Sequence, residues 1–263
     1  MAELPVRRGS RKHPYTKRVG LHAEIMRSNF QVKVTVDQDI NTIKCEPEPN
    51  TPTTRRGGPS AHNILVNGFG YNITYQDMQS LQCQNWVNDR IINFYLKMVV
   101  HRGNQQGPMK LASFDTYFYT MLMKHGYMSE IVMQWSRDID LSSVDLALIP
   151  VHHQGNHWCL AVVDTGYMCL RYFDSMGGRN DKGVKAIRCY LQECSKRKGM
   201  PSAWAVEYPK EIPRQLNSYD CGVFYCKYAQ YTCSQDGIMN FTQDDMPRFR
   251  KEMEWEITHK MLL

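Results

Sequence analysis

Residues 157–174, HWCLAVVDTGYMCLRYFD, predict two short strands joined by a tight turn. The segments HWCLAVVD (157–164) and MCLRYFD (168–174) are short, apolar and rich in β-branched or aromatic residues, and so is VDLALIPV (144–151) before them. We therefore expect three neighbouring strands at the centre of the fold.

The turn between the last two strands decides which side chains meet. If Thr165 and Gly166 form a two-residue loop, His157 lies directly opposite Asp174, whereas a four-residue loop makes them diagonal neighbours on the same face. With either loop, an imidazole and a carboxylate come within reach of each other. This is the base and orienting acid of a cysteine-protease triad in the chain order His, Asp, Cys. The alternative is a buried histidine bonded to an aspartate for structural reasons.

Helices are predicted on both sides of these strands. A capping box at Thr74 and Asp77 opens a short helix, and a cap at Asn88 or Asp89 opens the next, with Ile91, Ile92, Tyr95, Leu96 and Val99 on one face. Two further helices are expected from Ser113 to Gly126 and from about Lys182 to Gly199. A closing helix begins at Pro247 and has apolar residues spaced by four, namely Phe249, Met253, Ile257 and Met261. Helices that flank a cluster of strands predict an α+β domain of about 200 residues.

Residues 1–60 differ from the rest of the chain. They lack a sustained helical or alternating apolar period and end in the linker-like stretch EPEPNTPTTRRGGPS (46–60). They carry 11 Lys and Arg against 6 Asp and Glu, a balance of +5, which leaves +1 for residues 61–263. We predict a disordered basic arm at 1–60 and a folded domain at 61–263, whose near-neutral charge argues against nucleic-acid binding. The basic cluster at residues 7–18 is either a solvated tail or a nuclear-import signal.

The composition excludes several other classes. The 263 residues contain no apolar run long enough to span a membrane, and no apolar stretch typical of a secretory signal follows the basic beginning. We therefore expect an intracellular protein. The nine cysteines are an odd number without a C-x-x-C pair, which argues against a disulfide framework and against a zinc ribbon.

Cys221 lies in NSYDCGVFYC (217–226), at the predicted first turn of a helix. A thiol is a useful nucleophile near neutral pH only if something favours its thiolate, and a helix N-terminus and a neighbouring imidazole both do so. Asn217 or Ser218 can cap this helix, and Gly222 carries no side chain that would crowd an incoming carbonyl. The alternative is that Cys221 packs in the core as an ordinary buried cysteine.

Gln215 precedes Cys221 by six residues. Its side-chain amide can point an N–H at the oxygen that becomes negative when a thiolate attacks a carbonyl, with the Cys221 backbone N–H as the second donor. Surface glutamines are common, so this hypothesis depends on the neighbouring cysteine.

Five segments carry a resemblance to a known family. They are NWVNDRIINFYL (85–96), GNHWCLAVVD (155–164), YFDSMGG (172–178), PRQLNSYDCGVF (213–224) and MNFTQDDMPRFRKEMEWEI (239–257). In this order they resemble the catalytic domain of the Ulp/sentrin-specific protease family, cysteine proteases that process SUMO and remove it from its substrates. The resemblance runs from about residue 71 to the end of the chain.

The resemblance implies a papain-like α+β fold of the Ulp type and a protease that cleaves after the C-terminal Gly-Gly of SUMO. It implies these catalytic roles: Cys221 as nucleophile, His157 as general base, Asp174 as its orienting partner and Gln215 as oxyanion donor. It also implies that Trp86 and Trp158 wall a narrow tunnel that admits only glycines, and that Asp89, Phe114 and His153 contact the folded body of SUMO.

The implied partners are SUMO and SUMO-conjugated proteins, with no nucleic acid, membrane, metal or organic cofactor. A monomer in the nucleus, with the cytoplasm as a second location, is expected. Arg90 departs from the family, because many relatives have an acidic residue beside the position of Asp89. A protease for ubiquitin or another modifier, an acetyltransferase of the kind found among related bacterial effectors, and a SUMO-binding protein without activity are the alternatives.

Overall fold

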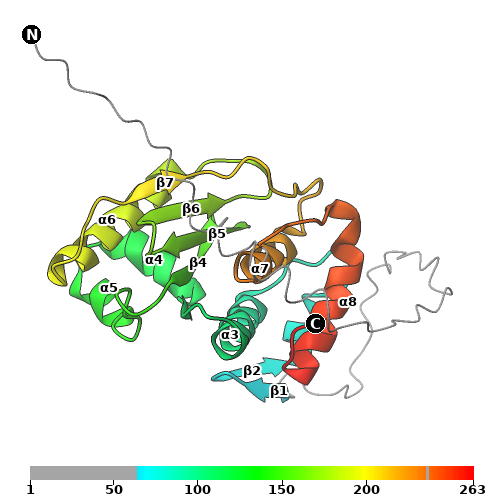
Figure 1. The fold of residues 1–263 in the computed structure, drawn as a ribbon. Helices are drawn as coiled ribbons and strands as arrows, with labels where there is room; N and C mark the ends of the chain where they lie inside the picture. Colours follow the sequence, from blue (N-terminus) through cyan, green and yellow to red (C-terminus); the bar gives the residue numbers. More distant parts are fainter. Residues whose placement is uncertain (1–63, 235–236) are drawn as a thin grey trace, which may run out of the picture. The chain divides into compact units, whose positions relative to one another are not determined.

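The computed structural model of the protein describes residues 64–234 and 237–263. At the centre of this part lies a five-stranded sheet in the order β3-β4-β5-β6-β7 (Figure 1). Its strands are β3 (Leu111–Ser113), β4 (Leu146–His153), β5 (His157–Asp164), β6 (Cys169–Phe173) and β7 (Ala205–Glu207). β4, β5 and β6 are antiparallel neighbours, whereas β3 and β7 run parallel to the strand beside them. The three central strands confirm the predicted ones to within two residues at each end.

Residues 165–168 form the turn between β5 and β6. Asp164 pairs with Cys169, so the loop has four residues. When this register is continued, Asp174 and His157 are diagonal neighbours on one face of the sheet. The four-residue alternative is therefore confirmed and the two-residue loop is wrong.

Two hydrogen bonds explain the longer turn. The Thr165 N–H donates to the Asp145 carbonyl oxygen at 3.0 Å, outside the hairpin. The Tyr167 N–H donates to the Asp164 carboxylate at 3.1 Å. Thr165 is thus bound to the segment that leads into β4 and does not close a two-residue turn.

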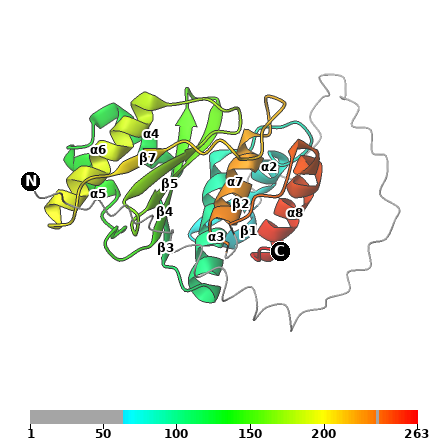
Figure 2. The same ribbon diagram turned by 45° about the horizontal axis from the view of Figure 1, so that its top comes forward.

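Helices cover both faces of the sheet. The α-helices are α2 (Tyr75–Gln79), α3 (Asp89–Gln106), α4 (Thr116–His125), α5 (Glu130–Trp135), α6 (Asp181–Arg197), α7 (Cys221–Thr232) and α8 (Met246–His259), with a short 3-10 helix, Gln243–Asp245, before α8. A separate antiparallel pair consists of β1 (Ile64–Gly68) and β2 (Tyr71–Thr74). Figures 1 and 2 show α4 and α6 on one face of the five-stranded sheet and α3 and α7 on the other.

The central strands are buried on both faces. Along β4, Leu146 and Leu148 belong to a hydrophobic core that includes residues of α3, α7 and α8. Ala147 and Ile149 belong to a second core with residues of α4 and α6. This alternation follows from the period of two along a strand and explains the nearly continuous apolar sequence of these segments.

Several predicted helix boundaries are confirmed. Thr74 and Asp77 form the capping box of α2. The Asn88 side chain accepts a hydrogen bond from the Ile91 N–H and caps α3. The apolar stripe predicted for α3 is buried, and α6 begins one residue before the predicted Lys182.

Two boundary predictions are wrong. Ser113 does not start a helix, because it ends β3; α4 begins at Thr116, where the Asp115 carboxylate accepts from the N–H groups of Tyr117 and Phe118. Met261 does not extend the apolar stripe of α8. Lys260 adopts a left-handed conformation with φ 55° that ends the helix, and Met261 is 56% exposed.

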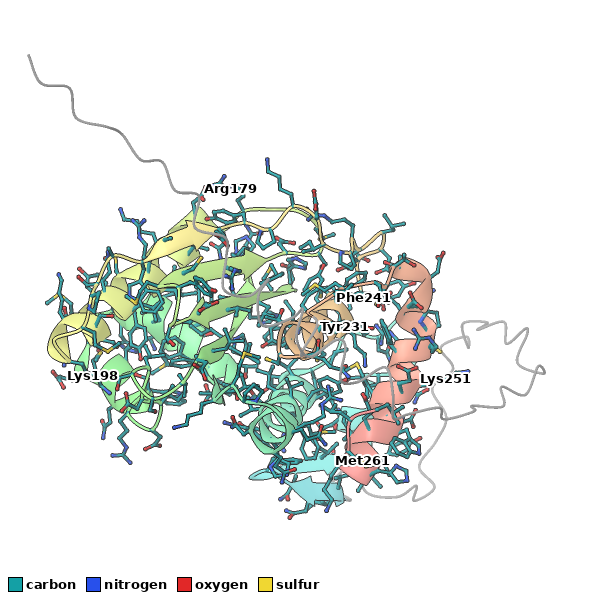
Figure 3. The ribbon with its side chains drawn as sticks, in the orientation of Figure 1. Arg179, Lys198, Tyr231, Phe241, Lys251 and Met261 are labelled. Atoms are coloured by element: carbon teal, nitrogen blue, oxygen red, sulfur yellow. The ribbon has the colours of Figure 1, made fainter. Side chains whose placement is uncertain are left out.

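A buried polar group joins α3, α7 and α8. The Lys227 ammonium donates to the Tyr95 hydroxyl at 2.9 Å and lies 3.5 Å from the Glu256 carboxylate. The Tyr95 hydroxyl donates to Glu256 at 2.7 Å. The aromatic ring of Phe241 packs nearby against Tyr231, with ring centroids 5.2 Å apart (Figure 3). These contacts fix α7 against its neighbours.

The predicted arm, residues 1–60, and its nuclear-import signal lie outside the described residues, and the domain boundary at residue 61 stays a prediction. Among the described residues, no helix is long and apolar enough to cross a membrane.

Candidate active site

Cys221 is the first residue of α7 and is only 2% exposed. The predicted position at a helix N-terminus is therefore correct, but the predicted cap is wrong. Asp220 is the N-cap, and Asn217 instead accepts hydrogen bonds from the Tyr219 and Asp220 N–H groups in the preceding turn. The thiol thus lies where the partial positive charge of the helix is greatest.

Asp220 does not cap α7 with its side chain. Its carboxylate accepts two hydrogen bonds from Arg250, at 2.9 and 2.7 Å, and one each from Asn217 and Gln243, at 2.6 and 2.8 Å. With these partners, the carboxylate makes no hydrogen bond to the first N–H groups of α7 and leaves the backbone N–H of Cys221 available. That N–H can serve as an oxyanion donor.

His157 and Asp174 form a short, largely buried pair. His157 Nε2 lies 2.8 Å from Asp174 Oδ1, with 12% and 7% of the two side chains exposed. The Met176 N–H donates to the same carboxylate oxygen at 2.8 Å. Burial raises the pKa of Asp174, but the hydrogen bonds from His157 and Met176 and the charge of His157 outweigh it, so the pKa is lower than usual.

The protonated form of His157 is strongly favoured. Burial lowers its pKa, but hydrogen bonds with the Asp174 carboxylate and with the thiols of Cys159 and Cys221 raise it to about 12. Because Nε2 faces Asp174, Nδ1 is the ring nitrogen left to exchange a proton with Cys221. The structure therefore brings the three predicted triad residues together.

Two glycines allow the chain to pack closely around Asp174. A Cβ on Gly178 would lie 2.8 Å from Asp174 Oδ2, so only glycine fits beside the carboxylate. Gly177 has φ +77°, and a Cβ there would lie 2.7 Å from Arg214 Nη1. Arg214 donates to the Asp174 carbonyl oxygen at 2.9 Å. The sequence DSMGG is thus explained by the packing around Asp174.

Gln215 is 7% exposed and is fixed by both ends of its amide. Its Oε1 accepts from the Ser175 hydroxyl at 2.8 Å, and its Nε2 donates to the Asn217 carbonyl oxygen at 2.7 Å. A longer contact of 3.4 Å joins Nε2 to Asn217 Oδ1. The amide therefore belongs to the loop that leads to Cys221, and its second N–H makes only the longer contact.

Residues 85–262 match the family model of the Ulp1 protease family, C-terminal catalytic domain. This chain belongs to the Ulp1 protease family. Sentrin-specific protease 2 of Mus musculus is 42% identical over 206 residues, which cover 76% of this chain and 34% of that protein. A sentrin-specific protease of Caenorhabditis elegans is 34% identical over 263 residues, 97% of this chain and 36% of that protein.

A solved structure of the C-terminal Ulp1 protease domain, in complex with Smt3, the yeast ortholog of SUMO, has a TM-score of 0.65 to this chain at 25% identity. The match covers 75% of this chain and 88% of that one. It confirms the predicted α+β fold of the Ulp type. The chain spans about a third of the length of the two sentrin-specific proteases that it matches.

The two tryptophans singled out by the Ulp1-family resemblance differ in environment. Trp86 is 51% exposed, whereas Trp158 is 7% exposed and stacks on His152 with ring centroids 4.2 Å apart. The Trp158 indole N–H donates to the Val87 carbonyl oxygen at 3.0 Å, which links β5 to the residue after Trp86. Both indoles therefore belong to segments that meet near α7.

Gly222 is the point where these segments approach α7. A Cβ there would lie 2.6 Å from Val87 Cβ and 3.4 Å from Trp158 Cδ1. The absence of a side chain at Gly222 thus allows close packing against Val87. This differs from the predicted reason, which was access for an incoming carbonyl.

The other three predicted SUMO contacts differ in their exposure to solvent. Asp89 is the first residue of α3, and His153 pairs with His157 at the end of the β4–β5 hairpin; both are partly exposed. Phe114 is only 3% exposed and packs against Phe118 and Tyr190, with ring centroids 4.2 and 6.1 Å away. The predicted contact of Phe114 with a substrate surface is therefore wrong in this structure, because its ring belongs to the core.

Sequence reasoning missed Cys159. Its sulfur and the ligand atoms of His157 and Asp174 all lie within 4.8 Å of one another. The signal was present, because Cys159 follows His157 by two residues on a predicted strand and must share its face. Within the described residues, these three side chains form a group close enough together to hold a metal ion.

Proposed function

We propose that this chain is the catalytic part of a SUMO-specific cysteine protease. It cleaves after the C-terminal Gly-Gly of SUMO, both in precursors and in conjugates with lysine side chains. The observation that carries the proposal is the 2.8 Å bond between His157 and Asp174, together with the contact of the same imidazole with the thiol at the start of α7. Membership of the Ulp1 family supports it.

In the first step, the Cys221 thiolate attacks the carbonyl carbon of the last glycine, and a carbon–sulfur bond forms. The carbonyl electrons move to oxygen, which the Cys221 N–H and the Gln215 amide stabilise. The 3.4 Å contact between Gln215 and Asn217 Oδ1 is the one that the oxyanion would replace. His157 then protonates the departing amine as the carbon–nitrogen bond breaks.

In the second step, His157 takes a proton from water, and the resulting hydroxide attacks the acyl-enzyme. The carbon–sulfur bond breaks, the SUMO carboxylate leaves and the thiolate is restored. The departing amine can be a lysine side chain or the N-terminus of a short peptide. One reaction therefore serves both deconjugation and precursor processing.

The burial of the nucleophile supports a substrate with a slender end. Cys221 is 2% exposed, so only a segment with little side-chain bulk can reach its sulfur. A Gly-Gly end satisfies this condition, and we propose that it passes between Trp86 and Trp158. Asp89 and His153, both partly exposed, are the proposed contacts with the folded body of SUMO.

The remaining features of the proposal come from the sequence. The enzyme acts as a monomer on SUMO and SUMO-conjugated proteins, in the nucleus and also in the cytoplasm, without nucleic acid, a membrane or a cofactor. The basic cluster at residues 7–18 supports import into the nucleus.

The test is the initial rate at which a fluorophore is released from the C-terminal glycine of SUMO and, in parallel, of ubiquitin. Fast release from SUMO alone, lost in Cys221→Ser while SUMO binding remains measurable, is expected. Near-normal turnover in Cys221→Ser would remove Cys221 as the nucleophile. Binding of SUMO without cleavage would make the chain a SUMO-binding protein, and cleavage of ubiquitin would overturn the substrate assignment.

A further inference from the structure

Cys159 has no role in the proposed mechanism, although it lies beside the His157–Asp174 pair. It follows His157 by two residues on β5, and the β5–β6 register brings it level with Asp174. The nitrogen, sulfur and oxygen ligand atoms of the three residues all lie within 4.8 Å of one another. An imidazole, a thiol and a carboxylate therefore converge on one point.

This set of donors suits zinc. Zn²⁺ binds sulfur at about 2.3 Å and imidazole nitrogen or carboxylate oxygen at about 2.0–2.2 Å, usually with tetrahedral geometry. In such a site neighbouring ligand atoms are about 3.3–3.8 Å apart. The 2.8 Å between His157 Nε2 and Asp174 Oδ1 must therefore lengthen by roughly half an ångström. Mg²⁺ and Ca²⁺ prefer oxygen ligands throughout, so a site with sulfur and nitrogen disfavours them.

The hydroxyl of Tyr172 is a second, independent observation. Tyr172 is 2% exposed, and among the described residues its hydroxyl has no hydrogen-bond partner. The Tyr172 hydroxyl lies beside the Cys159 thiol. A buried O–H without an acceptor is costly, and a thiolate at Cys159 would supply one.

We propose that His157, Cys159 and Asp174 form an inhibitory zinc site, with a water molecule as the fourth ligand. Binding releases the thiol proton of Cys159 and the Nε2 proton of His157 to solvent, and no oxidation or reduction takes place. The Tyr172 hydroxyl donates to the metal-bound sulfur. The charges of the thiolate and of the Asp174 carboxylate balance the two positive charges of the ion.

Zinc in this position stops turnover because it fixes the tautomer of His157. With Nε2 bound to the metal, the remaining ring proton is on Nδ1, and the imidazole can no longer accept a proton from Cys221 or from water. Cys221 is not a ligand in this arrangement. The binding step stands by itself, whereas the inhibition rests on the proposed protease function.

The first experiment measures binding by the full chain, freed of metal by a chelator and kept reduced with a phosphine. ZnCl₂ is titrated in competition with a chromophoric zinc indicator. Cys221→Ser is the background, so that the nucleophile contributes no ligand. One site is expected in Cys221→Ser, and the further change Cys159→Ala should weaken it at least about tenfold.

Cys169→Ala in the same background is the matched control. Cys169 is 3% exposed on the neighbouring strand β6 but lies outside the cluster, so its loss should leave zinc affinity unchanged. If Cys159→Ala disturbs folding, as judged by circular dichroism, Cys159→Ser keeps the side-chain volume and replaces it. Loss of zinc binding in Cys221→Ser itself would place the metal on the nucleophile and overturn the proposal.

The second experiment measures release of the fluorophore from SUMO at increasing ZnCl₂. The rate of each enzyme is divided by its own rate without zinc, and on that scale Cys159→Ala should need at least about tenfold more zinc than wild type for half-inhibition. Equal zinc sensitivity in the two enzymes would contradict the site. If no variant cleaves SUMO, the proposed function fails, and the binding titration still decides whether the zinc site exists.

Discussion

The guanidinium of Arg250 holds the carboxylate of Asp220, the residue before Cys221, with two hydrogen bonds of 2.9 and 2.7 Å. Both residues are buried, with 5% and 2% of their surface exposed. The same guanidinium donates to the carbonyl oxygen of Asn85, beside Trp86, at 2.9 Å. One side chain of α8 therefore connects the start of the nucleophile helix to the segment that carries an exposed tryptophan.

Replacing Arg250 with Met should lower the free energy of unfolding and slow the alkylation of Cys221. It would leave the Asp220 carboxylate buried without its cation, which typically costs about 3–5 kcal/mol in the free energy of unfolding. The uncompensated negative charge beside Cys221 would also disfavour its thiolate. Urea unfolding and the rate of Cys221 alkylation by iodoacetamide at pH 7 measure the two effects.

The double variant Asp220→Asn with Arg250→Met separates charge from packing. Removing both charges should recover part of the alkylation rate, because residue 220 then carries no uncompensated negative charge next to Cys221. Arg250→Lys keeps the charge but loses the bidentate geometry, so it should alkylate faster than Arg250→Met. Equal alkylation rates in wild type and Arg250→Met would mean that the pair has no electrostatic effect on Cys221.

The pH dependence of alkylation should report the proton on His157. Because the pKa of His157 is raised to about 12, its imidazolium persists through neutral pH and favours the Cys221 thiolate. His157→Ala should therefore be slower at pH 7, and the difference should shrink as pH rises through the range near 8.5, on the order of the ordinary thiol pKa. Rates measured with iodoacetamide from about pH 5 to 10, a range that brackets the ordinary thiol pKa, test this.

In Asp174→Asn, the deficit in alkylation rate relative to wild type should appear as pH rises from about 5 to neutrality, whereas in His157→Ala the deficit should shrink as pH rises. It removes the carboxylate that raises the pKa of His157, so the imidazolium should be lost as pH rises through about 6.5. The variant should match wild type near pH 5, roughly a unit or more below that value, and fall behind it above neutrality. An unchanged profile would show that Asp174 does not control the protonation of His157.

The centre of the fold could be predicted from local signals, but its edges could not. β4, β5 and β6 are apolar runs bounded by turn residues, and α2 and α3 begin at side chains that satisfy free N–H groups. β3 and β7 have only three residues each and are strands because they pair in parallel with β4 and β6. That pairing depends on residues distant in sequence, and three residues contain no period.

The site shows the same division between local and distant information. The His157–Asp174 pair could be derived because a hairpin keeps both on one face, whatever the loop length. The burial of Phe114 could not, because it depends on packing against Phe118 and on Tyr190 of α6. The bonds that hold Asp220 likewise come from Arg250, thirty residues later in the chain.

Gly222→Ala should disturb the nucleophile by crowding Val87. The added Cβ would lie 2.6 Å from Val87 Cβ, which is too close for two non-bonded carbons, and Val87 is 2% exposed and branched at that atom. Relief requires a shift of α7 or of the segment after Trp86, at a cost of about 1–3 kcal/mol in unfolding free energy. Because Cys221 is the adjacent residue, turnover of the SUMO–fluorophore substrate should fall even under conditions where urea unfolding shows that the variant is fully folded.

Val87→Ala in the Gly222→Ala background provides the space that the new methyl group needs. The double variant should regain turnover relative to Gly222→Ala, although Val87→Ala alone loses some core packing. Such recovery would assign the defect to the contact between these two residues. If the double variant is no more active than Gly222→Ala, the glycine is needed for another reason, such as access of the substrate carbonyl to Cys221.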